Sequence, residues 1–436
     1  MTAVPGLKQQ VGARAFLAIP NFRRLLFTRF AAQWSDGMFR AGLAGAVLFN
    51  PERGANPLTI AGGFAVLLLP YSLIGPFAGA LLDRWDRRRV LVWASLLRGL
   101  AVLIASAAVG LGVAGTGLFV IALLVEGISR FVGSGMSAAL PHVVPRPALV
   151  TANALSATLG AMIAVVGGAC AIGLRSAFGA DNVGSAWTTS FAVLGAILAA
   201  IIAARFTRGS LGPDSVDEPD DAVVAVARGL ADGGRAALAA PTVTAGFIAL
   251  FAHRASYGIS LLLTVLLLRF SFHDIGLLKA GLPGLGQLAV MAAAGILLAG
   301  FSTPRLVDRF GRHRVVLSSL LLAAVSQLAL GLPMMLPTVL AAAFLITAAG
   351  QVLKLCVDSA VQRDVGDEAR GRVFALYDTL FNITQVLAVA AAATLVPLDG
   401  RSPALLIVAT AVYLLGGAGY LLAIRRNPQV RRAPLA

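Results

Sequence analysis

The chain has 436 residues, of which 58% are hydrophobic and only 13% are charged. This balance excludes a soluble globular protein, because a soluble core of this size needs a larger polar surface to cover it. The formal net charge of +15 would suggest a nucleic-acid partner for a soluble protein. In a membrane protein it instead indicates basic loops that set the orientation of the helices, and we expect no nucleic acid as a partner.

Apolar stretches long enough to cross a bilayer, about 20 residues each, recur along the whole chain. Short polar breaks rich in Gly, Pro and Arg separate them. We therefore predict an all-α polytopic membrane protein with twelve transmembrane helices. The expected spans are residues 22–48, 58–81, 90–111, 117–140, 153–174, 184–205, 245–268, 284–304, 315–335, 338–361, 373–396 and 403–424.

The longest break, residues 207–240, begins with an acidic run that contains Pro213 and Pro219 and continues into a helix-like segment that ends near Leu238. Such a segment is typical of a linker between two domains. The sequence thus predicts three parts. They are an N-terminal six-helix bundle (1–206), a cytoplasmic linker (207–240) and a C-terminal six-helix bundle (241–436).

The basic residues are distributed unequally between the two sides of the membrane that these spans define. Of the 35 Lys and Arg residues, 25 fall on the side of the two termini and only five on the opposite side. Cytoplasmic loops carry the excess of Lys and Arg in membrane proteins. We therefore expect a multi-pass protein of the cytoplasmic (inner) membrane with both termini in the cytoplasm.

An internal repeat supports the division into two halves. Residues 83–90 read Asp-Arg-Trp-Asp-Arg-Arg-Arg-Val, and residues 308–315 read Asp-Arg-Phe-Gly-Arg-His-Arg-Val. Both copies fall between the second and third predicted helices of their half. Repeats at such a spacing indicate two pseudo-symmetric bundles.

The first copy, extended to residues 79–88, resembles the loop motif Gly-x-Leu-x-Asp-Arg-x-Gly-Arg-Arg/Lys of the major facilitator superfamily. Residues 139–145, Ala-Leu-Pro-His-Val-Val-Pro, and the opening residues 21–25 are similar to its drug-exporter branch. The chain departs from the superfamily's patterns at Asp86, where the loop motif has Gly. It also has Gly167-Gly168 where the antiporter motif of the fifth helix has Gly-Pro.

The resemblance implies the major facilitator fold and a gate at the cytoplasmic ends of the helices. A carboxylate there can bind arginines and the positive N-terminus of a neighbouring helix. The alternative is that the arginines only anchor the topology. The residues assigned to gating are Asp83, Arg84, Arg87 and Arg88, with Asp308, Arg309 and Arg312 as the counterpart in the second half, and Asp378.

Ionisable residues inside the predicted spans are the main candidates for function, because a charge in the bilayer costs about 2.5–3.5 kcal/mol on insertion scales. There are nine, and seven fall in the first and fourth spans of each half. In the superfamily that the chain resembles, these helices line the central cavity. The seven cavity residues are Asp36, Arg40, Glu126, Arg130, Arg254, Lys354 and Asp358; the other two are Arg98 and Asp378.

Six of the cavity residues form three pairs of opposite charge with i,i+4 spacing, which places each pair on one face of a helix. The pairs are Asp36 with Arg40, Glu126 with Arg130, and Lys354 with Asp358. A carboxylate that changes partner with conformation can bind and release a proton near neutral pH. Asp36 and Glu126 are the first candidates for this role, while the alternative is that the pairs only fix helix packing.

These features predict a secondary active transporter that works by alternating access, a proton-coupled exporter of amphipathic small molecules. No Gly-x-x-x-x-Gly-Lys loop is present, so ATP is not expected to drive it, and no cofactor or metal is expected. No nucleophile or metal-ligand constellation indicates an enzyme. We expect a monomer in the bilayer. The alternatives are an uptake permease of the same fold and a non-transporting membrane partner protein.

Overall fold

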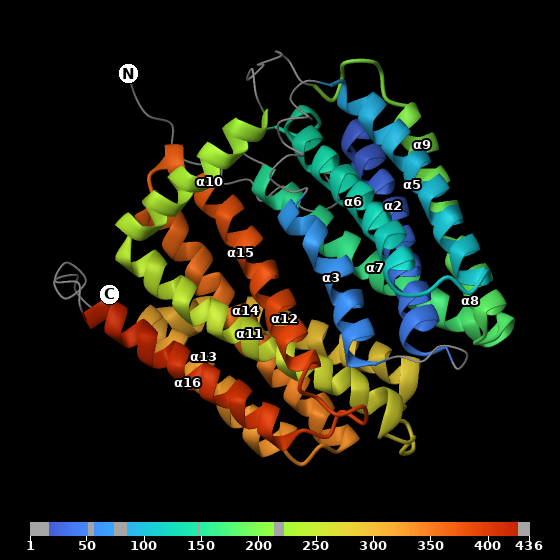
Figure 1. Ribbon diagram of the computed structural model, residues 1–436. Helices are drawn as coiled ribbons and strands as arrows, with labels where there is room; N and C mark the ends of the chain where they lie inside the picture. Colours follow the sequence, from blue (N-terminus) through green and yellow to red (C-terminus); the bar gives the residue numbers. More distant parts are fainter. Residues whose placement is uncertain (1–16, 51–55, 74–84, 146–148, 213–221, 426–436) are drawn as a thin grey trace, which may run out of the picture.

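The computed structural model describes residues 17–50, 56–73, 85–145, 149–212 and 222–425. Within these ranges the chain is almost entirely helical, and a single isolated bridge between Ile275 and Leu278 is the β-type pairing. The prediction of an all-α fold is confirmed (Figure 1). The helices of the N-terminal half are α2 (Pro20–Leu48), α3 (Pro57–Leu73), α5 (Arg87–Gly110), α6 (Thr116–Ala139), α7 (Leu149–Phe178), α8 (Asn182–Ser190) and α9 (Ala192–Ala204), with a 3₁₀ turn, η1 (Leu140–His142), after α6.

The linker helix α10 (Ala222–Ala239) precedes the C-terminal half. The expected helix-like segment that ends near Leu238 therefore lies where the structure has a helix. The helices that follow are α11 (Pro241–Phe270), α12 (Gly281–Phe310), α13 (Arg312–Ser326), α14 (Leu336–Asp364), α15 (Asp367–Ala393) and α16 (Pro403–Arg425), with a π-helical segment, η3 (Gln327–Gly331), at the end of α13.

Ten segments in the described part are long and apolar enough to cross a membrane. The other two predicted spans coincide with α2 and α3. Helix α2 has 29 residues, a length of about 43 Å at 1.5 Å per residue, but it carries several charges. The second predicted span, 58–81, continues beyond α3 into residues that lie outside the described ranges.

Proline marks the start of several helices. It has no backbone N–H, but N–H groups in the first turn have no partner within the helix, and the φ angle of proline already suits a helix. Pro20, Pro241 and Pro403 each begin a helix. The sixth predicted span is interrupted at Phe191, where α8 ends and α9 begins. These local signals explain why most predicted boundaries fall within a few residues of the observed ones.

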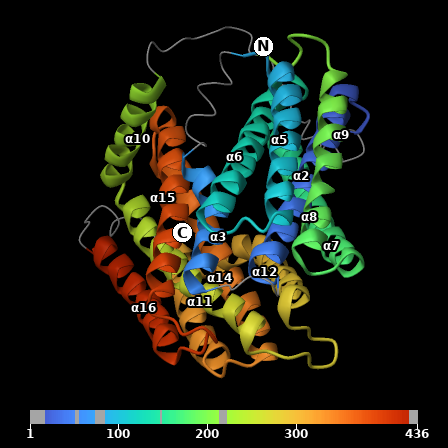
Figure 2. The ribbon, with the colours of Figure 1, turned by 45° about the vertical axis from the view of Figure 1, so that its right-hand side comes forward.

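The buried apolar side chains form one core in each half. One cluster draws only on residues between Phe22 and Leu211, and another only on residues between Ala237 and Tyr420. Helix α10 lies beside α15 in both ribbon views (Figures 1 and 2), and Arg372 of α15 binds Asp232 of α10 at 3.3 Å. The linker helix is therefore packed on the C-terminal half.

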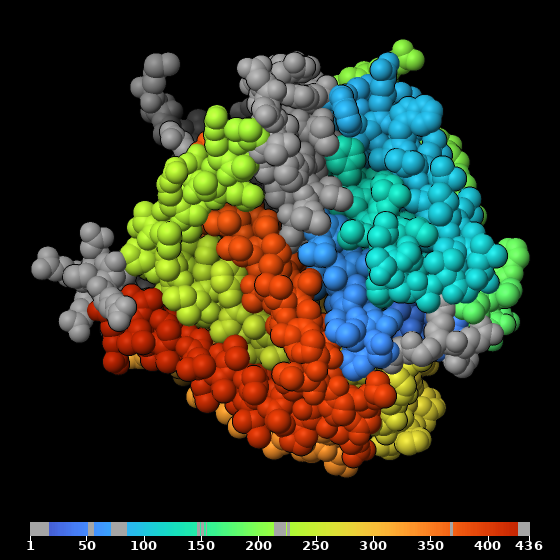
Figure 3. Space-filling model, viewed as in Figure 1, coloured from blue at the N-terminus to red at the C-terminus, as the bar shows by residue number. Residues whose placement is uncertain are grey.

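The two halves touch at the end of the molecule opposite α10. Ile60 and Ala61 of α3 share a core cluster with Val389 and Ala392 of α15, and α15 lies against α3 on the surface (Figure 3). Arg269 Nη2 donates to the backbone oxygen of Asn50 at 3.4 Å. These contacts join the halves at one end of the helices.

Candidate functional site

Asp36, near the middle of α2, lies inside the N-terminal half. Its carboxylate is 2.7 Å from Arg98 Nη2 of α5. Asp36 is 7% exposed and Arg98 is 2% exposed, so both charges are withdrawn from solvent. Arg98 Nη1 also lies 3.5 Å from the backbone oxygen of Ala32. A buried pair of this kind joins α2 to α5, and the loss of either partner would leave the other charge uncompensated.

Arg40 lies one helical turn after Asp36 and binds a carboxylate on a different helix. Its Nη2 is 2.7 Å from Glu126 Oε2 of α6, and its Nε donates to both carboxylate oxygens at 3.0 and 3.2 Å. The Glu126 side chain is 1% exposed, whereas that of Arg40 is 34% exposed. The pair therefore has one buried partner and one that is accessible from outside the protein.

In the C-terminal half, Lys354 and Asp358 of α14 form an ion pair within one helix. Lys354 Nζ is 2.7 Å from Asp358 Oδ2, and the two side chains are 34% and 19% exposed. The ammonium also lies 5.4 Å from the centre of the Tyr377 ring on α15. This pair is more open to its surroundings than Asp36 and Arg98.

Arg254 of α11 is surrounded by aromatic rings. Its guanidinium carbon is 4.0 Å from the centre of the Phe381 ring and 5.6 Å from that of Tyr257. An aromatic face attracts a cation and does not neutralise it. Arg254 forms no ion pair with a carboxylate in the part of the chain that the structure describes.

Asp378 of α15 lies within electrostatic range of charges in both halves. It interacts electrostatically with Lys354 and Asp358 of α14 and with Arg130 of α6, which belongs to the other half. The sequence also offered Arg363, Arg370 and Arg372 as gating partners for Asp378, and two of these arginines have other contacts. Arg372 binds Asp232, and Arg363 binds its neighbour Asp364 at 2.9 Å. Asp378 thus lies among the predicted cavity residues.

The predicted pairing within helices is right for Lys354 and Asp358 and wrong for Asp36 and Arg40. The i,i+4 rule places two residues on one helix face, but it gives no information about neighbouring helices. Asp36 finds Arg98 and Arg40 finds Glu126, because α5 and α6 bring opposite charges against α2. Glu126 accordingly takes its ion pair from another helix, and Arg130 lies within electrostatic range of Asp378.

The sequence did not single out the aromatic residues around the charges. Tyr257 and Phe381 flank Arg254, and Tyr377 lies beneath Lys354. A usable signal was present, since Tyr257 lies three residues after Arg254 and Tyr377 precedes Asp378. Aromatic residues are common in membrane helices, however, so spacing alone does not distinguish these from packing residues.

Part of the first gating motif can be located. Asp83 and Arg84 lie outside the described residues. Arg87 is buried, and its Nη1 donates to the backbone oxygens of Ala138 at 3.0 Å and Leu211 at 3.2 Å. Arg88 Nη2 donates to Ala204 O at 2.8 Å. Both arginines therefore bind the C-terminal ends of neighbouring helices or the segments that follow them, where a positive charge is favoured.

Asp86, the departure from the family pattern, caps α5. Its carboxylate accepts a hydrogen bond from the Arg88 backbone N–H at 2.9 Å. An aspartate at this position satisfies a backbone donor that the helix leaves free. The second copy of the motif has Gly311 instead, with a φ of +76° that suits glycine.

In the second copy, Arg312 is the residue with an interhelical partner. Its Nη2 is 3.6 Å from Asp364 at the end of α14. Asp364 also accepts a hydrogen bond from Thr242 of α11. Asp308 and Arg309 are both exposed at the end of α12. Of the three residues assigned here to gating, only Arg312 is thus placed to join helices.

The described residues contain no cluster of His, Cys, Asp and Glu that could hold a metal ion. The arrangement is instead a set of ionised and aromatic side chains on α2, α6, α11, α14 and α15. Its members come from both halves. Such an arrangement can bind a polar molecule and exchange ionic partners.

Comparisons with known proteins agree with this architecture. The family model described as Major Facilitator Superfamily matches residues 25–303 and 247–436. Two uncharacterized MFS-type transporters, from Mycobacterium tuberculosis and Mycobacterium bovis, are each 41% identical over 422 residues, covering 96% of this chain and 94% of theirs.

Solved structures share the fold at low sequence identity. The nucleoside transporter NupG superposes with a TM-score of 0.69 at 10% identity, covering 94% of this chain and 100% of that one. A bacterial homologue of the iron transporter ferroportin in an inward-facing state gives 0.65 at 16%, covering 92% and 98%. The chain therefore belongs to the major facilitator superfamily.

Proposed function

We propose that this protein is a secondary active transporter that exports amphipathic small molecules by alternating access, with protons as the coupling ion. The observation that carries the proposal is that each half holds a partly exposed cation in an ion pair, Arg40 with Glu126 in the N-terminal half and Lys354 with Asp358 in the C-terminal half. A partly exposed cation can change its partner when the halves move relative to one another. The charged residues then form part of the conformational equilibrium.

The proposed binding region lies between Arg40 and Glu126 on one side and Arg254, Lys354 and Asp358 on the other. Charges inside a membrane protein are costly unless they border a hydrated path or bind one another. Arg40 and Lys354 are each one-third exposed, which fits side chains at the edge of such a path.

Glu126 is our first candidate for the coupling carboxylate. It is buried and bound to Arg40, whose exposed side chain leaves it free to take another partner. When a change of conformation draws Arg40 away, Glu126 loses the charge that stabilises its ionised form, and protonation becomes favourable. Asp36 is the second candidate, but its arginine is fully buried and less free to leave.

The contacts between the two halves at the end opposite α10 bear on the conformational state of the transporter. If the linker is cytoplasmic, as the distribution of Lys and Arg predicts, these contacts close the outer end of the transporter. The protein then has the inward-facing arrangement, in which an exporter receives its substrate.

The test is transport in proteoliposomes that carry a pH gradient, with ethidium and rhodamine 6G as amphipathic probes. Wild type should move at least one probe against its gradient while internal pH changes, and Glu126→Gln should lower this flux at least tenfold. Asp399→Asn, a change in an exposed loop, serves as the matched control and should leave the flux unchanged.

The outcomes separate the possible assignments. If Glu126→Gln and Asp36→Asn both transport normally while Asp358→Asn is inactive, the coupling residue lies in the C-terminal half. Probe movement into the cytoplasmic side, driven by the same gradient, would identify an uptake permease. A reconstituted protein that moves neither probe nor protons would contradict the proposal.

A further inference from the structure

The C-terminal half contains a cavity inside its own bundle, apart from the charged region between the halves. It is lined by α11, α12, the π-helical segment η3, α14 and α16, and it encloses about 50 Å³. One water needs about 10–15 Å³ on this measure, so there is room for a group of several non-hydrogen atoms. None of the lining residues carries a charge.

Gln327, the first residue of η3, has an unused donor at this cavity. The residue is 1% exposed, and its Oε1 accepts a hydrogen bond from Ser260 Oγ at 3.0 Å. Its Nε2 is buried without a hydrogen-bond partner. A buried amide donor left unpaired costs about 1–3 kcal/mol, so a natural protein rarely keeps one without a reason.

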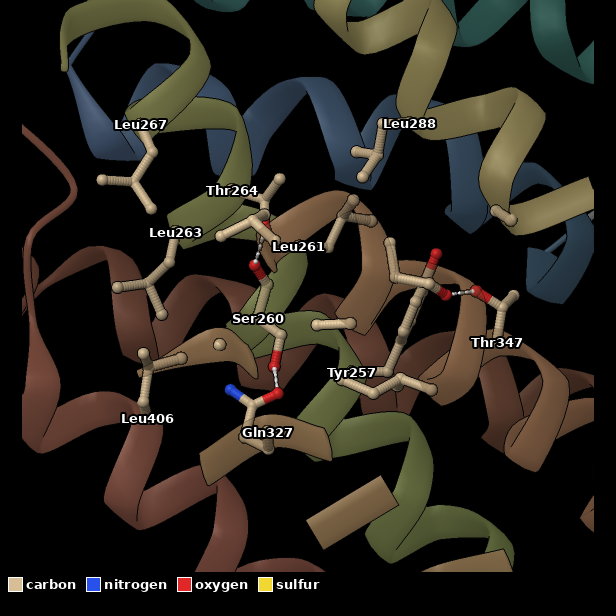
Figure 4. A pocket seen from close by; sticks show the side chains of 16 residues that line it. Tyr257, Ser260, Leu261, Leu263, Thr264, Leu267, Leu288, Gln327, Thr347 and Leu406 are labelled. Atoms are coloured by element: carbon tan, nitrogen blue, oxygen red, sulfur yellow. Dashed lines mark hydrogen bonds between the residues drawn. The ribbon is translucent and has the colours of Figure 1, made fainter. Parts of the chain in front are cut away.

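The two threonines of the cavity have their donors committed. Thr264 donates to the backbone oxygen of Ser260 at 2.8 Å, and Thr347 donates to that of Ala343. The single hydroxyl hydrogen of Ser260 lies within reach of two acceptors, Gln327 Oε1 at 3.0 Å and the Ser256 backbone oxygen at 2.9 Å. Figure 4 shows these side chains around one space, with the Gln327 amide oxygen directed at Ser260 and its nitrogen on the side of Leu406. Hydroxyl oxygens remain as acceptors, and the donors left at the cavity are the Gln327 amide N–H and the hydroxyl of Tyr257.

The backbone is unusual at the same position. π-helical turns are rare and often occur at functional sites, because the extra residue in the turn displaces side chains from their regular positions. Here the π-helix begins at Gln327 and ends at Gly331, which also lines the cavity. The irregular turn therefore places the amide against the cavity.

We propose that this cavity is a binding site for a small uncharged group that carries an oxygen acceptor, such as a carbonyl, ether or alcohol. Gln327 donates to that oxygen, and the leucine and alanine side chains of α11, α12 and α14 enclose its carbon atoms. The absence of charge among the lining residues excludes an ionised group, which would not be compensated there.

Tyr257 connects this site to the charged region. Its ring lines the cavity, and the same ring lies 5.6 Å from the Arg254 guanidinium. A ligand in the cavity would thus adjoin the region that we propose for transport. The site itself does not depend on proton coupling or on the direction of transport.

The experiment is ¹⁹F NMR of trifluoroacetamide, a small uncharged amide, with the full chain in nanodiscs and no gradient. Wild type should broaden the signal saturably, and Gln327→Leu should weaken binding at least fivefold. Gln385→Leu is the matched control, because Gln385 is also buried with an unpaired amide oxygen but lies outside the cavity. It should bind as wild type does.

A second variant keeps the test decisive if Gln327→Leu fails to fold. Ala343→Leu fills the partly exposed rim of the cavity and should abolish binding while leaving the amide in place. Equal binding by wild type and Gln327→Leu, or by trifluoropropane and trifluoroacetamide, would overturn the proposal, since the amide would then have no role. If both variants bind trifluoroacetamide as wild type does and still transport the dyes, this site is disproved while the proposed function stands.

Discussion

The two halves hold the ionisable residues inside their predicted spans in different ways. In the N-terminal half, ion pairs join separate helices, with Arg98 bound to Asp36 and Arg40 bound to Glu126. In the C-terminal half, Lys354 binds within its own helix and Arg254 rests on aromatic rings. The first arrangement fixes helices relative to one another, whereas the second lets a side chain change partner without separating helices.

Close backbone contacts show the same difference. A Cβ on Gly37 of α2 would lie 1.8 Å from the backbone oxygen of Ala164 on α7, and one on Gly167 would lie 2.1 Å from that of Trp34. The corresponding contact in the other half is looser, because a Cβ on Gly258 of α11 would lie 3.1 Å from Gln385 O of α15. The difference teaches that equivalent helix pairs of pseudo-symmetric bundles need not be equally close, although other pairs of the C-terminal half are tight, since a Cβ on Gly295 of α12 would lie 2.4 Å from the Phe344 backbone oxygen of α14.

The largest expected effect is on the buried pair of the N-terminal half. Arg98→Met leaves Asp36 ionised without its partner and should destabilise the protein by about 3–5 kcal/mol. The measurement is the free energy of unfolding in detergent. The double variant Arg98→Met with Asp36→Leu should recover most of the loss, because no unpaired charge remains. A double variant as unstable as the single one would show that the pair is not the cause.

A smaller effect is expected from the glycine contact. Gly37→Ala forces a methyl group into the backbone of α7 and should cost about 1–3 kcal/mol, as overpacking does. Gly258→Ala should cost less, since its neighbour is farther away. Gly63→Ala is the control, because a Cβ there meets nothing within 4 Å. Thermal unfolding of the three variants checks the order, and equal values for Gly37 and Gly258 would remove the contrast between the halves.

The smallest effect on stability should come from the pair within α14. Lys354→Met breaks an ion pair that is partly exposed and confined to one helix, so the loss should be below about 1 kcal/mol. The flux of an accepted probe should nevertheless fall by tenfold or more, since the residue faces the proposed binding region. A loss of stability similar to that of Arg98→Met would mean that the pair of Lys354 and Asp358 also holds the fold together.

The sequence predicted the fold well because the membrane imposes it. A bilayer allows only segments whose backbone groups are satisfied internally, so long apolar stretches become helices. Proline and the acidic linker then mark where helices start and where the halves divide. The positions of α5, α6 and α14 followed from these signals.

The partners of the charges could not be predicted in the same way. Composition showed that Asp36 and Arg98 are out of place in lipid, but their pairing depends on how α2 packs against α5. The Gln327 cavity gave no signal at all, since a π-helical turn has no reliable sequence pattern and a lone glutamine in an apolar helix has many explanations. What the sequence could give was the set of candidate residues, and the arrangement among them required the packed structure.

The attachments on either side of the central connection have a mechanical consequence. The chain is held to the N-terminal half at Gly212, whose backbone oxygen accepts from the Arg87 N–H at 3.1 Å, and α10 is held to α15. Ala222 follows Gly212 by ten positions in the sequence. A fully extended chain spans at most about 33–36 Å over ten residues. The connection is thus a tether of fixed maximum length, and it sets an upper bound on how far the two bundles can swing apart while both ends stay attached.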